Sequence, residues 1–386
     1  MPVSRAKGVL FVAAALVGAS SAVAAAMLPS PTGPHPVGRR VLRWIDQSRH
    51  EVLSRSTTDK REVIVWVWYP AAPQPAAKIA SYVDELEQVA KALSRAEASL
   101  ARKGEAHAFA NAPVASDVAP WPVVFFSPGS GMLPGLYATF CEELASRGYV
   151  VAGIDHPYDD RAVLLSDGRV VKQAKQPSDG ETLLRFERER VTVRTQDLEF
   201  ALDQFERIRD GELTDPLRGH IDLSHVGVFG HSVGGMTAAQ FCQEDARVGA
   251  CGNLDGVVAA MPAYAEPLRG IARPFLFIQK PFPAVKGESP ETAAQRVGRL
   301  RAKSDNLFAG VRSGHSYRVT IAGATHESFS DIEVLTRDSP RDRELLVLAR
   351  DYVRAFFDRT LKGEKGTLLD REPEDGAVRV ESFDPR

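Results

Sequence analysis

Residues 226–235 read Val-Gly-Val-Phe-Gly-His-Ser-Val-Gly-Gly, and this stretch is the most informative in the chain. An apolar, strand-like run stops at Gly230, and a helix-compatible run over residues 236–243 follows. A serine at the apex of a strand–turn–helix needs small residues two positions to either side, because the strained turn brings backbone segments together. Gly230 and Gly234 occupy those positions around Ser232. The pattern therefore predicts an exposed Ser232 hydroxyl that a histidine can deprotonate, rather than an ordinary serine in a turn.

The composition bounds the class of protein without naming a function. The 386 residues are 44% hydrophobic and 25% charged, which suits one large α/β domain or two smaller ones. A formal net charge of −2 argues against a nucleic-acid-binding protein, which would be strongly basic. No Cys/His spacing resembles a metal site, so we expect neither a metal nor another cofactor.

The first 26 residues have the layout of a secretory signal peptide. Arg5 and Lys7 form a positive start, residues 8–17 are apolar, and alanines within residues 22–26 offer cleavage sites. The uncharged run of residues 8–28 would also suit an uncleaved membrane anchor, but its Ala, Ser and Gly content favours cleavage. We therefore expect export to the periplasm or the extracellular space.

The rest of the chain divides into a linker, one domain and a tail. Residues 27–39 are expected to form an extended, poorly ordered linker because they are rich in proline, and residues 363–386 a polar tail on the surface. Between them, over residues 40–362, short apolar strands alternate with helical stretches, which predicts a mostly parallel central sheet with helices on both faces. The predicted strands are 40–45, 62–69, 122–127, 149–154, 225–230, 248–254, 274–279 and 317–321, and the predicted helices are 81–103, 136–147, 181–209 and 341–361.

Partners for Ser232 are expected where the parallel strands end, because those ends meet at one edge of the sheet. Asp255 ends the strand that follows the nucleophile helix, and His326 lies in the loop after the last predicted strand. The chain order serine, acid, histidine is the one that this architecture uses. Glu288 and Asp305 are the alternative acids, since they follow the next strand along the chain.

The oxyanion hole has candidates in two places. Residues 127–132 read Ser-Pro-Gly-Ser-Gly-Met and end a predicted strand, where the glycines let a backbone N–H turn toward the reacting carbonyl. The residue after the nucleophile supplies the second donor in this fold. We therefore assign the backbone N–H groups of Ser130 and Val233 to the hole.

Three other histidines lie near predicted strand ends or near Ser232. His231 is expected to pack beside the serine, and His156, which follows Asp155, to be a pocket-rim or structural residue. His315 is a weak rival to His326 because it precedes the last predicted strand.

The chain contains three cysteines, and their state is open. Cys242 and Cys251 flank a short connection beyond Ser232, so they would pair in an oxidising compartment. Alternatively, these two and Cys141 are small buried hydrophobic residues.

These motifs together resemble those of the plasma-type platelet-activating factor acetylhydrolases and their bacterial relatives in the α/β-hydrolase superfamily. The resemblance spans about residues 40–362 and implies an α/β-hydrolase fold with Asp255 as the acid. One departure is Pro128, which stands where that family typically has histidine before the glycine, and it bears on the shape of the oxyanion hole. The matching segments are residues 126–131, 230–235, 254–256 and 324–329.

The residues alone predict a serine carboxylic-ester hydrolase with a Ser-His-Asp triad that acts on an ester whose acyl group the pocket accepts. Taken with the resemblance, the expected substrate is a small-molecule or lipid ester. The resemblance implies release of short or oxidised acyl groups from glycerophospholipids, with transient contact to a membrane surface. The predicted helix 81–103 either packs plainly or borders the acyl pocket and meets lipid. Alternatives are a hydrolase of other soluble or polymeric esters, or an amidase or peptidase with the same triad. A non-catalytic binding protein is disfavoured because such proteins usually lose a triad member.

Overall fold

The computed structural model describes residues 28–73, 78–116, 120–256, 270–282, 285, 287–305, 308–311, 314–373 and 376–383. The predicted signal peptide, residues 1–26, lies outside the described residues.

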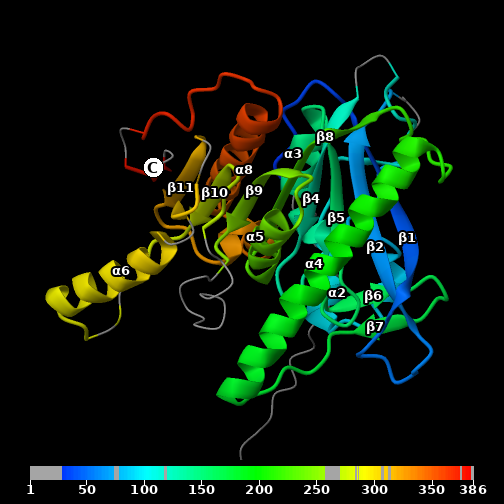
Figure 1. Ribbon diagram of the computed structural model, residues 1–386, viewed down its shortest axis with the longest axis horizontal. Helices are drawn as coiled ribbons and strands as arrows, with labels where there is room; N and C mark the ends of the chain where they lie inside the picture. The colour runs from blue at the N-terminus through cyan, green and yellow to red at the C-terminus, as the bar shows by residue number, and fades with distance from the viewer. Residues whose placement is uncertain are drawn as a thin grey trace, which may run out of the picture.

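A 10-stranded sheet runs through the molecule in the order β12-β11-β10-β9-β8-β4-β5-β2-β1-β3 (Figure 1). The consecutive strands from β11 to β5 in this order pair in parallel, whereas β12, β2 and β1 pair antiparallel with their inner neighbours. The predicted mostly parallel sheet is therefore confirmed. A separate hairpin joins β6 and β7. The strands are β1 (Val37–His50), β2 (Lys60–Pro70), β3 (Phe109–Ala110), β4 (Trp121–Ser127), β5 (Val150–Asp155), β6 (Ala162–Leu164), β7 (Val170–Lys172), β8 (Ile221–His231), β9 (Val248–Leu254), β10 (Phe275–Gln279), β11 (Ser316–Ile321) and β12 (Val378–Phe383).

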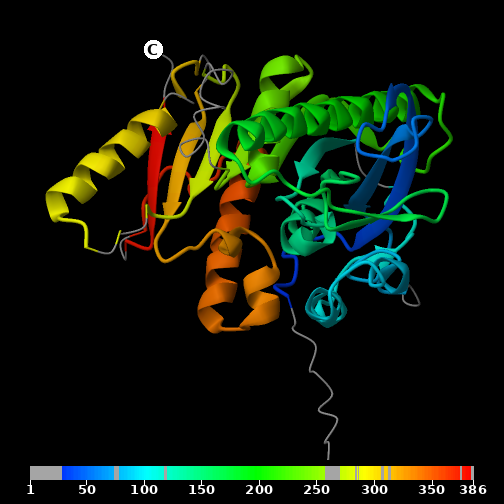
Figure 2. The same cartoon turned by 90° about the horizontal axis from the view of Figure 1, so that it is seen from below.

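Helices cover both faces of the sheet, as the alternation of strands and helices predicts. Helices α4 and α5 lie over one face, and α3 and α8 lie over the other (Figure 2). The helices are α1 (Leu86–Val89), α2 (Arg95–Lys103), α3 (Ala138–Ser146), α4 (Gly180–Asp210), α5 (Val233–Glu244), α6 (Pro290–Asp305), α7 (Ile332–Thr336) and α8 (Pro340–Leu361), with short 3₁₀ helices η1 (Pro134–Tyr137) and η4 (Glu327–Phe329).

The strand side chains alternate between these two layers. In β4, Val123 and Phe125 pack under α4 and α5, while Val124 and Phe126 pack under α3 and α8. All four are completely buried, because a parallel strand with helices on both faces has no side open to water.

The segment predicted as one helix over residues 81–103 is instead two short helices, α1 and α2. Glu85, which precedes α1, has a left-handed backbone conformation with φ 47°. Ser94 and Glu97 form a reciprocal capping box that starts α2 anew. Apolar periodicity and helix propensity do not register such local capping, so the interruption was missed. Val83 and Val89 bury their side chains in the same layer as α3 and α8.

The linker predicted to be poorly ordered packs on α3 over its described part. The backbone N–H and the hydroxyl of Thr32 each donate to the Glu143 carboxylate at 2.7 Å, and the Gly33 N–H donates to the Ser146 hydroxyl at 3.0 Å. The buried carboxylate on α3 thus finds its donors in the proline-rich segment. Composition predicted the extended backbone but not this docking.

The tail predicted to lie on the surface contributes an edge strand. β12 pairs antiparallel with β11 from Ser316↔Phe383 to Ile321↔Val378. Val378 is buried, and Val380 packs against the same hydrophobic layer. Two alternating apolar positions, Val378 and Val380, are too weak a signal for a strand in a polar stretch.

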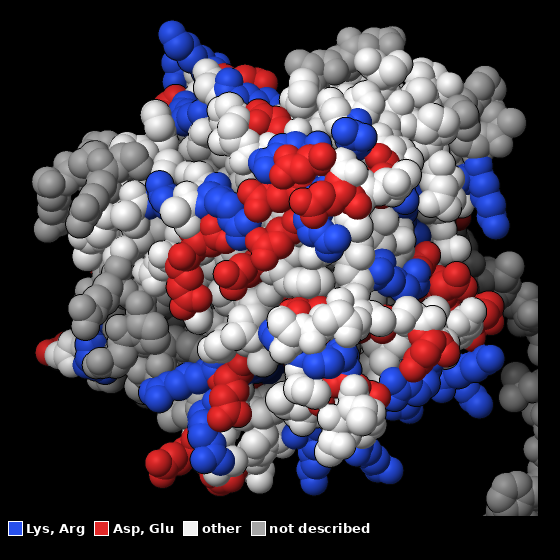
Figure 3. All heavy atoms as spheres, turned by 45° about the vertical axis from the view of Figure 1, so that its right-hand side comes forward, with Lys and Arg blue, Asp and Glu red and all other residues white. Residues whose placement is uncertain are grey.

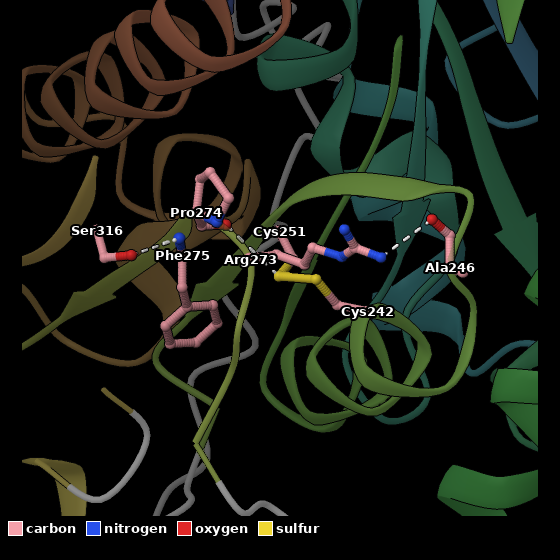
Figure 4. Close-up of a disulfide and its surroundings, with 7 residues drawn as sticks. All are labelled: Cys242, Ala246, Cys251, Arg273, Pro274, Phe275 and Ser316. Atoms are coloured by element: carbon pink, nitrogen blue, oxygen red, sulfur yellow. Dashed lines mark hydrogen bonds between the residues drawn. A yellow bond between two sulfur atoms is a disulfide. The ribbon is translucent and has the colours of Figure 1, made fainter. Parts of the chain in front are cut away.

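A disulfide joins Cys242 near the end of α5 to Cys251 in β9 (Figure 4). The question that the sequence left open is thereby resolved in favour of pairing, while Cys141 is free and buried. The Cys251 N–H donates to the Pro274 carbonyl at 3.0 Å, so the bridge lies where β9 meets the start of β10. The crosslink joins α5 to β9, the strand that ends at Leu254 directly before Asp255.

Acidic and basic side chains intermingle over the face shown in Figure 3. Neighbouring charges of this face therefore compensate one another. Among the ion pairs of the described residues, Asp203 and Glu206 of α4 both bind Arg247, at 2.7 and 2.8 Å. Among the described helices, none combines the length and the hydropathy needed to cross a membrane.

Candidate active site

Ser232 lies between β8 and α5 in a strained backbone conformation, with φ 55° and ψ −123°. A side chain at Gly230 would overlap the Gly234 carbonyl, and one at Gly234 would overlap the carbonyls of Ser127 and Pro128. Only glycine fits at either position, as the motif predicts. The same packing places the end of β4 directly against the turn of residues 230–234 around Ser232.

Asp255 and His326 meet across the sheet edge. His326 Nδ1 lies 2.7 Å from Asp255 Oδ2, although 71 residues separate the two in the chain. Asp255 lies beside the elbow, because the Ser232 N–H donates to the carbonyl of Leu254 at 2.9 Å. Within the described residues the Ser232 hydroxyl makes no hydrogen bond, and such contacts often tighten only when substrate is bound.

Neither alternative acid contacts His326. Glu288 pairs with Arg296 at 3.0 Å, and Asp305 pairs with Arg318. Of the three carboxylates that the sequence proposed, Asp255 is therefore the one in contact with the imidazole. The rival histidine, His315, has φ 73° and lies beside Tyr317 at the amino end of β11, whereas His326 follows the carboxyl end of that strand.

Lys280 is a neighbour of Asp255 that sequence reasoning missed. Its ammonium group contacts Asp255 Oδ2, the oxygen that also accepts from His326. Burial would raise the pKa of Asp255, but the hydrogen bonds from His326 and Lys280 and the positive charge of Lys280 hold that pKa below its ordinary value. Asp255 is therefore a carboxylate at neutral pH. Its place directly after a predicted strand was the signal that could have pointed to Lys280.

The two proposed oxyanion donors have no acceptor among the described residues. The Gly129 N–H donates to the Tyr137 hydroxyl at 3.0 Å, and the Gly131 N–H donates to the Asp159 carbonyl at 3.2 Å, whereas the Ser130 N–H between them makes no such bond. Val233 is the first residue of α5, where a helix leaves its N–H without an internal partner. The helix dipole also favours negative charge at this end. Both groups are free to receive an oxyanion.

A second serine–histidine–aspartate group includes Ser127, the last residue of β4, which directly precedes the segment with the proposed oxyanion donor Ser130. Ser127 Oγ lies 3.0 Å from His156 Nε2, and His156 Nδ1 lies 2.8 Å from Asp197 Oδ2. The sequence neighbour of His156, Asp155, accepts from Trp66 Nε1 at 2.8 Å and makes no hydrogen bond with the imidazole among the described residues. His156 has no exposed surface, so it does not lie at the rim of an open pocket. Its structural role stays a prediction.

The described residues contain no cluster of three or more His, Cys, Asp and Glu side chains arranged to hold a metal ion.

Comparisons with known proteins give a consistent result. The family model described as platelet-activating factor acetylhydrolase, isoform II, matches residues 20–339. A probable 1-alkyl-2-acetylglycerophosphocholine esterase of Arthroderma benhamiae is 25% identical over 382 residues, covering 91% of this chain and 92% of the relative. The platelet-activating factor acetylhydrolase of Gallus gallus is 24% identical over 239 residues, which cover 55% of this chain and 53% of that relative. The solved structure of a ferulic acid esterase from Streptomyces cinnamoneus superimposes with a TM-score of 0.70 at 28% identity, covering 94% of this chain and all of that one.

Proposed function

The chain belongs to the platelet-activating factor acetylhydrolase isoform II family and is an ester hydrolase of the α/β-hydrolase fold, and from this premise we propose that Ser232, His326 and Asp255 are its catalytic triad. The observation that carries the proposal is the 2.7 Å hydrogen bond between His326 and Asp255 beside the strained serine. The strain supports the assignment because a non-glycine residue adopts such a conformation only where the surroundings impose it, as they do at functional sites.

In the proposed reaction the Ser232 oxygen attacks the ester carbonyl while His326 Nε2 takes the hydroxyl proton. Asp255 accepts the hydrogen bond from Nδ1, which keeps Nε2 unprotonated and stabilises the imidazolium that forms. The imidazolium then protonates the leaving alkoxide, and the alcohol departs from an acyl-enzyme. Water, deprotonated by the same imidazole, releases the acid and restores Ser232.

The oxyanion of each tetrahedral intermediate would accept from the backbone N–H groups of Ser130 and Val233. Each donor lacks another acceptor within the described part of the chain, so neither must give up a hydrogen bond as the charge develops. A donor of this kind contributes about 3–4 kcal/mol to the stabilisation of the transition state.

For the substrate we propose short or oxidised acyl groups on glycerophospholipids, with transient contact to a membrane surface. The family membership and the relative named for 1-alkyl-2-acetylglycerophosphocholine support this choice. The likeness to a ferulic acid esterase supports the alternative, a soluble or polymeric ester. An amidase or peptidase would use the same triad, so amide substrates belong in the test.

Export is part of the proposal, on the strength of the signal-like layout of residues 1–26. N-terminal sequencing of the protein from its host should find a start after residue 24 or 26. An intact Met1 in the membrane fraction would favour an anchor instead.

Two measurements test the proposed triad and substrate. A fluorophosphonate probe should label Ser232 alone, and Ser232→Ala should abolish both labelling and hydrolysis of p-nitrophenyl acetate. The variant Ser127→Ala should still be labelled at Ser232, because the wild-type Ser127 hydroxyl is buried and out of reach of the probe. A label on Ser127, or ester turnover by Ser232→Ala, would contradict the assignment. Rates across nitrophenyl esters of rising chain length, a 2-acetyl phospholipid, methyl ferulate and a nitroanilide then separate the substrate classes.

A further inference from the structure

Tyr137 and His231 form a chain of hydrogen bonds beneath the candidate active site. The Gly129 N–H donates to the Tyr137 hydroxyl at 3.0 Å, and that hydroxyl lies 2.8 Å from His231 Nδ1. His231 Nε2 lies 2.9 Å from the carbonyl oxygen of His326. Two side chains therefore connect three loops that are far apart in the sequence. They are the loop around Gly129 and Ser130 (the oxyanion loop), the turn around Ser232 (the elbow) and the loop that contains His326 (the His326 loop).

The donor and the acceptor of each hydrogen bond in this series follow from its two terminal groups, the Gly129 N–H and the His326 carbonyl. A carbonyl only accepts, so His231 Nε2 carries the proton and donates to His326; Nδ1 then accepts from the Tyr137 hydroxyl. That hydroxyl in turn accepts from the Gly129 N–H. A neutral His231 with its proton on Nε2 satisfies all of these requirements at once.

Burial keeps both side chains in these forms. Burial and the nearby charge of His326 lower the pKa of His231 to about 3, and burial raises the pKa of Tyr137 well above its ordinary value. The connection is also tight: a Cβ at Gly129 would lie 3.0 Å from the Tyr137 oxygen and 3.2 Å from His231 Nδ1. The His231 ring lies against the His326 ring, with centroids 4.5 Å apart.

We propose that Tyr137 and His231 are positioning residues that hold the oxyanion loop and the His326 loop at a set distance from each other. The proposal rests on the proposed triad. Ser130 follows Gly129, so the bond to Tyr137 sets the position of the proposed oxyanion donor. The bond from His231 anchors the backbone of the proposed base. Both groups act on charge that exists only in the transition state, and a displacement of about 1 Å costs on the order of 100-fold in rate.

The test is Tyr137→Phe, which keeps the ring and removes both hydrogen bonds. We expect kcat for p-nitrophenyl acetate to fall about 10- to 100-fold with KM within about twofold, because ground-state binding does not use the oxyanion hole. Tyr149→Phe is the matched control: Tyr149 is equally buried and donates to Asp358 at 2.8 Å, but it lies at the opposite edge of the sheet. This control should lower the melting temperature similarly and leave kcat unchanged.

His231→Gln provides a second, independent variant should Tyr137→Phe fold poorly. We expect a similar loss in kcat, and the double variant should lose no more than the worse single variant, since either change breaks the same chain. Each of three outcomes would overturn the proposal: an unchanged kcat in a folded single variant, a rise in KM with no change in kcat, or losses of kcat that multiply in the double variant. Ser232→Ala, assayed alongside, reports on the triad itself, so a failure of the positioning role and a failure of the triad are distinguishable.

Discussion

The protein contains two serine–histidine–aspartate groups, the proposed triad of Ser232, His326 and Asp255 and a buried group of Ser127, His156 and Asp197, and in both the aspartate contacts the histidine. In the first, Ser232 is strained at φ 55° and the His326 side chain is about one-third exposed. In the second, Ser127 ends β4 in the interior, and His156 and Asp197 have no exposed surface. Residue types do not separate the two groups, and only in the second does the serine hydroxyl lie within hydrogen-bond distance of its histidine, at 3.0 Å.

The surroundings of the second group explain its different role. Arg61 binds the Asp197 carboxylate at 2.5 Å, and Arg194 donates to the Ser127 hydroxyl at 3.3 Å and to the Pro128 carbonyl at 2.6 Å. The Arg194 guanidinium thus lies against the Ser127 hydroxyl, at the position that an ester substrate would have to occupy if Ser127 were a nucleophile. Arg194 thereby links the buried serine to the backbone of Pro128, two residues before the proposed oxyanion donor Ser130. Under the proposed assignment, backbone strain and access to solvent, more than the three residue types, distinguish the nucleophile Ser232 from Ser127.

The largest effect should come from Asp255→Asn. An amide cannot hold His326 in the tautomer that accepts from Ser232, so we expect kcat to fall by a factor on the order of 10⁴ with the fold intact. Glu288→Gln and Asp305→Asn are the matched controls and should stay within a few-fold of wild type in p-nitrophenyl acetate hydrolysis. A large loss in either control, with Asp255→Asn still active, would move the acid to the later strand.

The corresponding change in the second group, Asp197→Asn, should act mainly on stability. It leaves the buried Arg61 with only Glu51 as a charged partner at 2.7 Å, and breaking such a buried pair costs about 3–5 kcal/mol in the free energy of unfolding. Chemical denaturation measures this, with Asp210→Asn at the exposed end of α4 as the control, expected within about 0.5 kcal/mol of wild type. A loss of kcat at unchanged stability would mean that the buried group takes part in the chemistry.

The smallest effect is a pH dependence that His156 contributes. Burial and the charge of Arg194 outweigh Asp197 and lower the pKa of His156 from 6.5 to about 4. Between these values the unfolded chain binds a proton that the folded protein does not, so the free energy of unfolding falls as the pH falls from about 6.5 to 4. The total is on the order of 3 kcal/mol.

Urea denaturation at several pH values checks this sign. His156→Gln should be less stable at pH 7 but should show a shallower decline toward pH 4 than wild type. His50→Gln, at an exposed position, is the control and should keep the wild-type slope. Equal slopes in all three proteins would show that His156 does not titrate in this window.

Local patterns carried the prediction of the fold. The apolar runs of β2, β4, β5 and β8 to β11 were recognisable because a strand covered on both faces must be apolar at nearly every position. Weak or interrupted patterns misled in three places: the capped break between α1 and α2, the docked linker on α3, and the edge strand β12. In each case a specific long-range or capping contact outweighed composition.

The sequence by itself determined the elbow around Ser232, because the close approach of backbone segments there tolerates only glycine at positions 230 and 234. It also ranked Asp255 and His326 correctly as the residues that meet, since parallel strands end at one edge. Only the tertiary structure decided which side chains surround them: Lys280 on the acid, Tyr137 and His231 beneath the loops, and Asp197 rather than Asp155 beside His156. The contacts of Lys280, His231 and His156 join segments 25 to 95 residues apart. Their energy depends on burial and on the direction of each hydrogen bond, neither of which a local pattern of residue types encodes.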